Sequence, residues 1–257
     1  MMYREFLVMK KAVIALTIIA LIPSLIFAYA QLSLHGADRF SSPLSFALTT
    51  LIGWSLALFA SIYGAAFAGT SREAARTLWV LPSARWRNAA LAMMVDVASI
   101  FVACAILIAI MYVPELPFIG PAKIASMLAN FDPHALLFAL AFPFAVYGYS
   151  ALVGMLLRRA PFAGVAVIPV GVIWTMLAQD PASSLLRALA PFNPVALMTH
   201  SAKAPGLQVK FSGFTVDRLG AALHWLTPNI AIAMLLVLGA AACAAAVGLW
   251  TRAQILA

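Results

Sequence analysis

The sequence predicts an all-α membrane protein with six transmembrane helices, on the basis of three observations. Of its 257 residues, 65% are hydrophobic. Only 9% are charged, whereas a soluble domain has about 25% charged and about 45–50% apolar residues. The apolar residues are gathered into runs long enough to cross a bilayer, which takes about 20 residues of helix. The length leaves room for one membrane domain and for no sizeable soluble domain.

Six apolar runs meet this length, and together they predict a single transmembrane domain over 1–257. The runs are 12–32, 44–68, 89–112, 134–157, 161–178 and 229–250. The fourth run contains Pro143, and the fifth begins at Pro161 and contains Pro169. Membrane helices tolerate such prolines, which commonly kink them. Residues 28–30 also have the A-x-A form of a signal-peptidase site, so cleavage of the first run is an alternative that leaves the remaining topology unchanged.

Lysine and arginine are distributed unevenly over the two sides of this topology. With six spans both termini lie on one side, and that side carries ten Lys and Arg residues against two acids. The other side carries six against five. Because basic loops stay in the cytoplasm, both termini are predicted to be cytoplasmic. The cytoplasmic location of these basic residues explains the net charge of +8 better than a nucleic-acid partner, so membrane lipids are expected as partners and nucleic acid is not.

The segment 69–88, GTSREAARTLWVLPSARWRN, is the only cytoplasmic loop of any size in this topology. Ser71 can cap a helix in which Glu73 takes the favourable first turn. Arg72 and Arg76 are four residues apart and therefore share a face of that helix. Taken alone, the segment leaves two interpretations open: an anchor on anionic headgroups, or a docking helix for a cytoplasmic partner.

The longest external link, about 179–228, is predicted to contain a short interfacial helix in the stretch SSLLRALAPF. Ser183 or Ser184 can cap its start. Thr227 and Pro228 then have the pattern of a cap and a first helical position, which predicts the start of the last span there.

Polar residues inside the predicted spans are few. Asp96 is the one acid within a span, and such an acid usually faces a cavity or a partner. Two interpretations stay open: Asp96 lines a translocation path or pairs across a dimer, or it is structural and satisfied by water, Ser99 or a nearby arginine. The four histidines are all external, at His35, His134, His200 and His224. Their spacing matches no metal motif, so no metal site is predicted.

Small residues recur at helical spacing in two spans, which allows close helix packing. These are Ala60, Gly64 and Ala68, and Ala240, Ala244 and Gly248. Packing within one subunit and a dimer interface both remain open for each set. The aromatic residues Trp174, Tyr147 and Tyr149 are either ordinary core residues or the lining of a path.

Four features resemble ABC-2-type permeases, the transmembrane subunits of bacterial ATP-binding-cassette exporters. The start MYREFLVMKK looks like the amphipathic elbow helix of that family. The length with six spans, and a long external link before the last span, are also similar. The most specific feature is a Glu-containing short helix followed by LPSAR, which resembles the family's E…T…LP-x-x-R segment.

The resemblance implies a mechanical role in the bacterial cytoplasmic (inner) membrane. Since the chain has no G-x-x-x-x-G-K-[ST] phosphate loop, ATP and Mg²⁺ are expected on a separate cassette ATPase, and the chain itself is expected to be neither an enzyme nor a cofactor carrier. A second copy or a homologous permease would complete the export pathway. The implied ATPase-coupling residues are Arg72, Glu73, Arg76, Thr77, Leu78, Leu81, Pro82 and Arg85. The implied elbow residues are Tyr3, Arg4, Phe6 and Lys10.

Two other classes of function remain open. One is an ATPase-independent polytopic protein, either a membrane enzyme or an assembly scaffold, although no G-x-S-x-G or H-E-x-x-H motif occurs. The other is a secondary transporter, for which more intramembrane charge than Asp96 and often internal repeats are expected.

Overall fold

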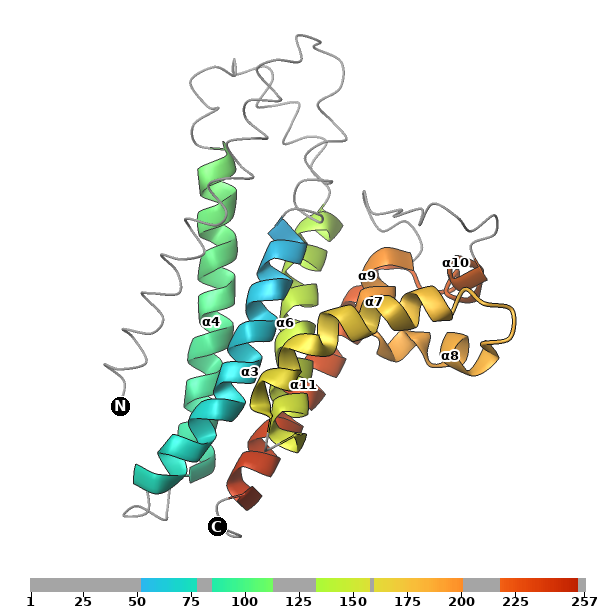
Figure 1. Cartoon of the computed structure of the whole chain (residues 1–257). Helices are drawn as coiled ribbons and strands as arrows, with labels where there is room; N and C mark the ends of the chain where they lie inside the picture. Colours follow the sequence, from blue (N-terminus) through green and yellow to red (C-terminus); the bar gives the residue numbers. More distant parts are fainter. Residues whose placement is uncertain (1–51, 78–84, 113–132, 158–159, 201–217, 254–257) are drawn as a thin grey trace.

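Helices account for the regular structure of the chain, and no strand occurs in the residues that the computed structural model describes, namely 52–77, 85–112, 133–157, 160–200 and 218–253 (Figure 1). The four long helices are α3 (Trp54–Thr77), α4 (Arg85–Tyr112), α6 (Pro133–Leu156) and α11 (Pro228–Ala253). Three of them, α4, α6 and α11, contain stretches long and apolar enough to cross a membrane. The described part of the chain therefore has the character of a membrane protein.

These helices lie close to three of the predicted runs. The runs 89–112, 134–157 and 229–250 coincide with α4, α6 and α11 to within a few residues, so these three long apolar helices are confirmed. The run 12–32, the elbow segment and the first part of the run 44–68 lie outside the described residues.

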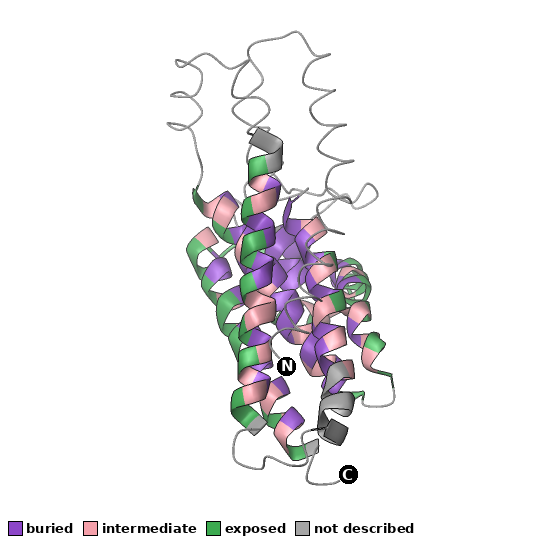
Figure 2. Ribbon diagram, turned by 90° about the vertical axis from the view of Figure 1, so that its left-hand side faces the viewer, coloured by how far each residue is buried: buried purple, intermediate pink, exposed green. Residues whose placement is uncertain are grey.

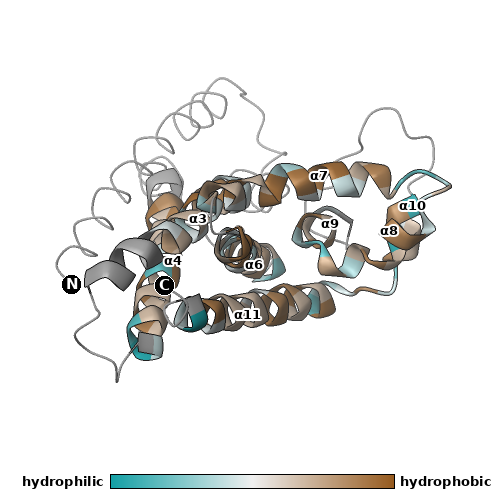
Figure 3. Ribbon diagram, turned by 60° about the horizontal axis from the view of Figure 1, so that its bottom comes forward, coloured by the Kyte–Doolittle hydropathy of each residue, from teal (hydrophilic) through white to brown (hydrophobic). Residues whose placement is uncertain are grey.

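The central helix of the bundle is α6. Figure 3 shows it enclosed by α3, α11 and α9. In the most apolar stretch of α6, 61% of the residues are buried, whereas the corresponding share is 39% in α11 and 33% in α4. Phe138, Phe142 and Tyr147 of this helix are completely buried. Their positions make α6 the core of the described bundle.

Glycines let both neighbours approach the backbone of α6 closely. A Cβ atom added at Gly64 of α3 would lie 2.5 Å from the Tyr147 carbonyl oxygen and 2.8 Å from the Ala151 nitrogen. On the other side, a Cβ at Gly148 would lie 2.6 Å from the carbonyl oxygen of Gly239 in α11. Helix association in membranes depends on such close van der Waals contact, since lipid tails are as apolar as the side chains.

The helix α3 is continuous from Trp54 to Thr77. The apolar stretch of this helix ends at Gly69, next to the predicted end of the run 44–68, but the prediction that Ser71 caps a new helix is wrong. Gly69 and Ser71 lie within regular helix. Glycine in a helix interior costs only about 1 kcal/mol relative to alanine, and α3 accommodates it without interruption.

The fifth predicted span, 161–178, is also different from the expectation of one membrane-crossing helix. It forms a 3₁₀ segment, η4 (Pro161–Ala166), followed by α7 (Val167–Leu177), and it is too short to rank among the spanning stretches. The segment first climbs back along α6, where Gly164 lies against the carbonyl of Ser150. It then leaves the bundle to one side (Figure 1).

A lateral lobe follows, built from α7 and four short helices in the described residues before the last span, the first of which lies in the stretch SSLLRALAPF, where the sequence predicted a short helix. These are α8 (Ser184–Ala188), η5 (Ala190–Phe192), α9 (Pro194–His200) and α10 (Arg218–Ala222). Asn193 is buried at its centre and donates to the Gly171 carbonyl at 2.9 Å and to the Thr175 hydroxyl at 3.1 Å. Its own side-chain oxygen accepts from Val195 N–H at 3.0 Å. These bonds join α9 to α7.

Two of the predicted helix starts can be compared with the structure directly. Thr227 does cap α11, because its hydroxyl oxygen accepts the N–H of Ile230 at 3.4 Å. Ser183 occupies the cap position of α8, but its side chain makes no capping hydrogen bond.

The outer surfaces of the bundle helices are apolar. Figure 2 shows buried residues along the inner sides of the helices and exposed ones outside. Large apolar side chains are among the exposed ones, including Ile62 of α3, Met94 of α4 and Val237 of α11. A bilayer accommodates such a surface, which would be an aggregation hazard in water.

Replacing Gly64 by alanine is expected to force α3 away from α6 and to destabilise the protein by about 1–3 kcal/mol, the usual range for overpacking. The measurement is thermal unfolding of the purified chain in detergent micelles, followed by circular dichroism. Gly69→Ala is the matched control on the same helix, because a Cβ there meets nothing within 4 Å. Equal stability of the two variants would contradict the close α3–α6 contact.

Candidate functional site

Asp96 lies on the inner face of α4. Five buried apolar residues of this helix lie on one side, and with position 96 included they recur at alternating intervals of four and three, which is the spacing of one helical face. They are Ala89, Met93, Ile100, Ala103 and Leu107, and Ser99 and Cys104 next to this series are buried as well. Asp96 falls into this series between Met93 and Ile100 and is half-buried. Its carboxylate is therefore directed toward the bundle and not toward lipid.

Tyr147 holds the carboxylate of Asp96. Its hydroxyl donates to Oδ2 of Asp96 at 2.8 Å, and Tyr147 itself is completely buried in α6. Ser99, which the sequence offered as a partner of the carboxylate, donates to the main-chain carbonyl oxygen of Asp96 at 2.6 Å. The bond between Tyr147 and Asp96 thus links α4 to the central helix.

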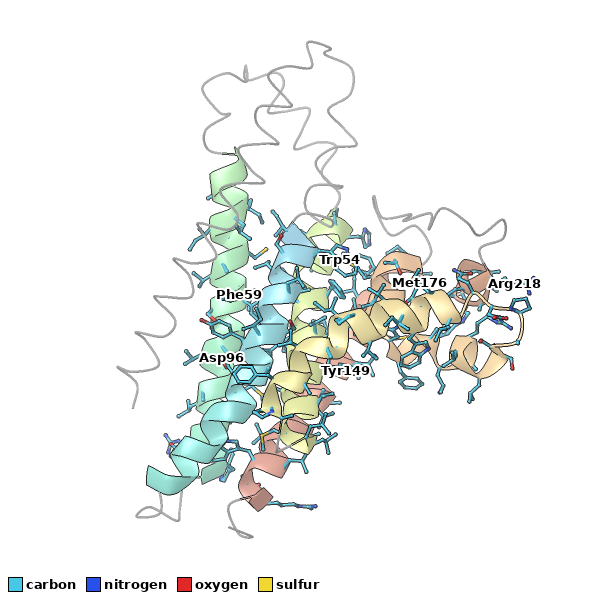
Figure 4. All side chains as sticks on the ribbon, in the orientation of Figure 1. Trp54, Phe59, Asp96, Tyr149, Met176 and Arg218 are labelled. Atoms are coloured by element: carbon cyan, nitrogen blue, oxygen red, sulfur yellow. The ribbon has the colours of Figure 1, made fainter. Side chains whose placement is uncertain are left out.

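Two aromatic side chains of α3 complete the cluster. Tyr63 lies close enough to Asp96 to interact with its charge. The Tyr63 hydroxyl is buried and has no hydrogen-bond partner among the described residues. Its ring is 4.4 Å from that of Phe59, centroid to centroid. Figure 4 shows Phe59 and Asp96 between α3 and α4. We call Phe59, Tyr63, Asp96 and Tyr147 the aromatic–acid cluster.

Sequence reasoning singled out Asp96 and named Tyr147 as either a core residue or the lining of a path, but it did not connect the two and did not find Phe59 and Tyr63. The positions of Asp96 and Tyr147 along their helices, and hence their depth in the membrane, were a signal that could have linked the two. Asp96 lies 11 residues after the start of α4 and Tyr147 lies 9 residues before the end of α6, which corresponds to about 16 and about 14 Å of helix. Because consecutive spans run antiparallel, the two side chains had to lie at similar depth.

The coupling residues implied by the resemblance fall on two helix ends. Arg72, Glu73, Arg76 and Thr77 form the last turns of α3, and Arg85 is the first residue of α4. Leu78, Leu81 and Pro82 lie outside the described residues, as do the elbow residues Tyr3, Arg4, Phe6 and Lys10. The end of α3 and the start of α4 lie at the same end of the bundle as the last residues of α6 and α11 (Figure 1).

The two sets of small residues have opposite surroundings. Ala60, Gly64 and Ala68 are buried between helices of the same chain, so packing within the subunit explains them. Ala240, Ala244 and Gly248 are exposed on the outer face of α11.

The histidines do not come together in the described part of the chain. His134 contacts the Asn229 side-chain oxygen through Nε2 at 3.0 Å, and His224 contacts the Ala221 carbonyl through Nδ1 at 2.6 Å. Among the described residues no three His, Cys, Asp or Glu side chains are grouped as metal ligands would be. His35 lies outside the described residues.

Comparison with known proteins adds no relative: no family model, curated protein or solved structure matches the chain.

Removing the Tyr147 hydroxyl in Tyr147→Phe is expected to destabilise the protein by about 0.6–1.7 kcal/mol, the range for hydrogen bonds between membrane helices. Combined with Asp96→Asn in a double-mutant cycle on thermal unfolding, the two changes should be non-additive by about 0.5 kcal/mol or more.

Tyr149→Phe is the matched control for this cycle. Its hydroxyl donates to the carbonyl oxygen of Phe192 at 2.8 Å, so the effect of this change should add to that of Asp96→Asn. Additivity of Tyr147→Phe with Asp96→Asn would show that the bond between α4 and α6 does not stabilise the bundle.

Proposed function

We propose that the chain is the transmembrane permease subunit of an ATP-binding-cassette exporter in the bacterial cytoplasmic membrane. In this function a separate cassette ATPase binds ATP and Mg²⁺, and the chain converts movements of that ATPase into export. The resemblance of the segment 69–88 to the coupling region of ABC-2-type permeases motivates the proposal.

The continuity of α3 is the single observation that best supports it. The apolar stretch of α3 begins at Trp54 and ends near Gly69, and the charged residues Arg72 to Thr77 extend the same helix. A helix is a stiff rod of 1.5 Å rise per residue. A force applied at the charged end would therefore be transmitted along the apolar part to Gly64, where α3 contacts the backbone of α6.

The charge distribution of the described helix ends agrees with a cytoplasmic partner surface. The last turns of α3 and the first turn of α4 carry Arg72, Arg76, Arg85 and Arg87, with Glu73 as the only acid between them. These ends lie beside the end of α11, which carries Arg252. Basic residues gathered at one end favour a cytoplasmic placement of that end.

A second permease subunit would contact an outward face of the bundle. The exposed small residues of α11 would permit close approach of such a subunit. A second copy of this chain and a homologous permease both agree with the sequence. We therefore place the second subunit at α11 within this proposal.

Secondary transport is the second candidate function, because of one specific observation. An acid bonded to a tyrosine inside the bundle, as Asp96 is to Tyr147, is typical of ion or substrate pathways in membranes. Such a transporter would act without an ATPase, which separates the two candidates experimentally.

Charge reversal at the end of α3 tests the exporter function. The first step is to establish whether a neighbouring gene encodes a cassette ATPase. The chain is then co-expressed with that ATPase, and co-purification and stimulation of ATP hydrolysis are measured. Glu73→Arg and Arg76→Glu should each weaken both about tenfold or more, since misplaced charges at an interface are strongly unfavourable.

Arg252→Glu is the matched control, because it reverses a charge at the same end of the bundle but on α11. It should leave complex formation and ATP hydrolysis unchanged. If Glu73→Arg and Arg76→Glu behave like this control, the segment is a membrane anchor and the coupling function is wrong.

A further inference from the structure

The aromatic–acid cluster brings one carboxylate together with three aromatic rings in the seam between α3, α4 and α6. Tyr147 donates to the carboxylate of Asp96, Tyr63 is close enough to interact with its charge, and Phe59 lies against Tyr63. Mechanical coupling through α3 requires no such combination. A carboxylate beside aromatic rings has the chemistry of a binding site.

Aromatic faces and a carboxylate both attract positive charge. The face of an aromatic ring carries partial negative charge, and a desolvated cation over it gains about 2 kcal/mol or more. A carboxylate in surroundings of low dielectric strengthens that attraction. We propose that this seam binds a monovalent lipophilic organic cation, with Asp96 as its counter-charge and the rings of Tyr63 and Phe59 against its apolar groups.

A metal ion fits the same residues poorly. Hard cations such as Ca²⁺ take six to eight oxygen ligands, whereas the rings of the cluster supply apolar surface and only two phenol oxygens. Met93, Ile100 and Ala60 belong to the same apolar core as Tyr147, with Tyr63 packed against it, and such side chains suit the hydrocarbon part of an organic cation.

The helix α4, which forms one side of the seam, has far fewer contacts with α3 and α6 than these two helices have with each other. The apolar stretch of α4 is 33% buried, compared with 61% for α6, and Asp96 keeps part of its surface exposed. A lipophilic cation partitions into the bilayer and meets α4 there. Entry between α4 and α3 separates fewer contacts than entry beside α6.

Such a cation is an export substrate only if the exporter function proposed above holds, but its binding does not depend on an ATPase. The test therefore uses the full chain alone, in lipid nanodiscs, titrated with tetraphenylphosphonium and followed by calorimetry. Saturable binding is expected. Tetraphenylborate, which has the same shape and the opposite charge, should show no saturable binding.

Asp96→Asn should weaken tetraphenylphosphonium binding about tenfold or more, a loss of about 1.4 kcal/mol. Asp180→Asn is the matched control, because this acid lies in the lateral lobe, where its side chain accepts the N–H of Ala182 at 2.9 Å. Its affinity should equal that of the unchanged chain.

A second pair of variants keeps the test decisive if Asp96→Asn fails to fold. Tyr63→Phe retains the ring and should bind normally, whereas Tyr63→Leu removes the ring and should weaken binding several-fold. The proposal is overturned if the unchanged chain does not bind, or if neither Asp96→Asn nor Tyr63→Leu weakens binding. The two proposals can fail separately. If the charge reversals at the end of α3 do not affect ATP hydrolysis but tetraphenylphosphonium still binds, the exporter function is refuted and the binding site is not.

Discussion

The close approach of α3 and α11 to the backbone of α6 is the contact on which the rest of the bundle depends. Gly64 on one side and the pair Gly148 and Gly239 on the other leave no room for a Cβ atom. Tyr147 lies between these two contacts, and its own carbonyl is the group that Gly64 approaches. The position of its ring is therefore determined by backbone packing on both sides, and its hydroxyl is held where Asp96 can accept it.

The helix α4 is attached in a different way. It has no glycine in its sequence, and its exposed outer residues include Leu91, Met94 and Phe101. With less apolar surface buried in the described bundle than α6, α4 depends more on its polar bond. A hydrogen bond to a carboxylate in surroundings of low dielectric is strong and directional. The bond between Asp96 and Tyr147 thus specifies the position of α4, where apolar contact alone would allow it to slide.

The sequence predicted the helices whose position depends on length and hydropathy alone. The helices α6 and α11 begin within one residue of the predicted spans, because an apolar run of sufficient length must be a helix in a bilayer. Hydropathy does not indicate in which direction the chain continues after a turn. The path of η4 and α7 depends on contacts between distant residues, such as Gly164 with Ser150 and Gly171 with Val195.

The same limit applied to the polar residues. The composition singled out Asp96 because an acid in a span is rare, but its partner Tyr147 is 51 residues away. A buried tyrosine is indistinguishable from any other core aromatic until the helices are placed. Ser71 suggested a helix boundary because serine favours caps. In α3 the helix continues through this residue, since serine does not make helical backbone impossible.

The proposed coupling function and the proposed cation site both involve α3. Its charged last turns and the ring of Tyr63 belong to one continuous helix, 14 residues apart between Tyr63 and Thr77, or about 21 Å. A tilt of α3 pivots at Gly64, because that is where the helix touches the α6 backbone. Tyr63 lies beside this pivot and close enough to Asp96 to interact with its charge, so movement of the charged end alters the seam through the position of one ring. The bond between Tyr147 and Asp96 lies on α6 and α4, which such a tilt does not displace. In this geometry the carboxylate stays in place while the aromatic wall beside it moves, and binding of a cation depends on the position of α3.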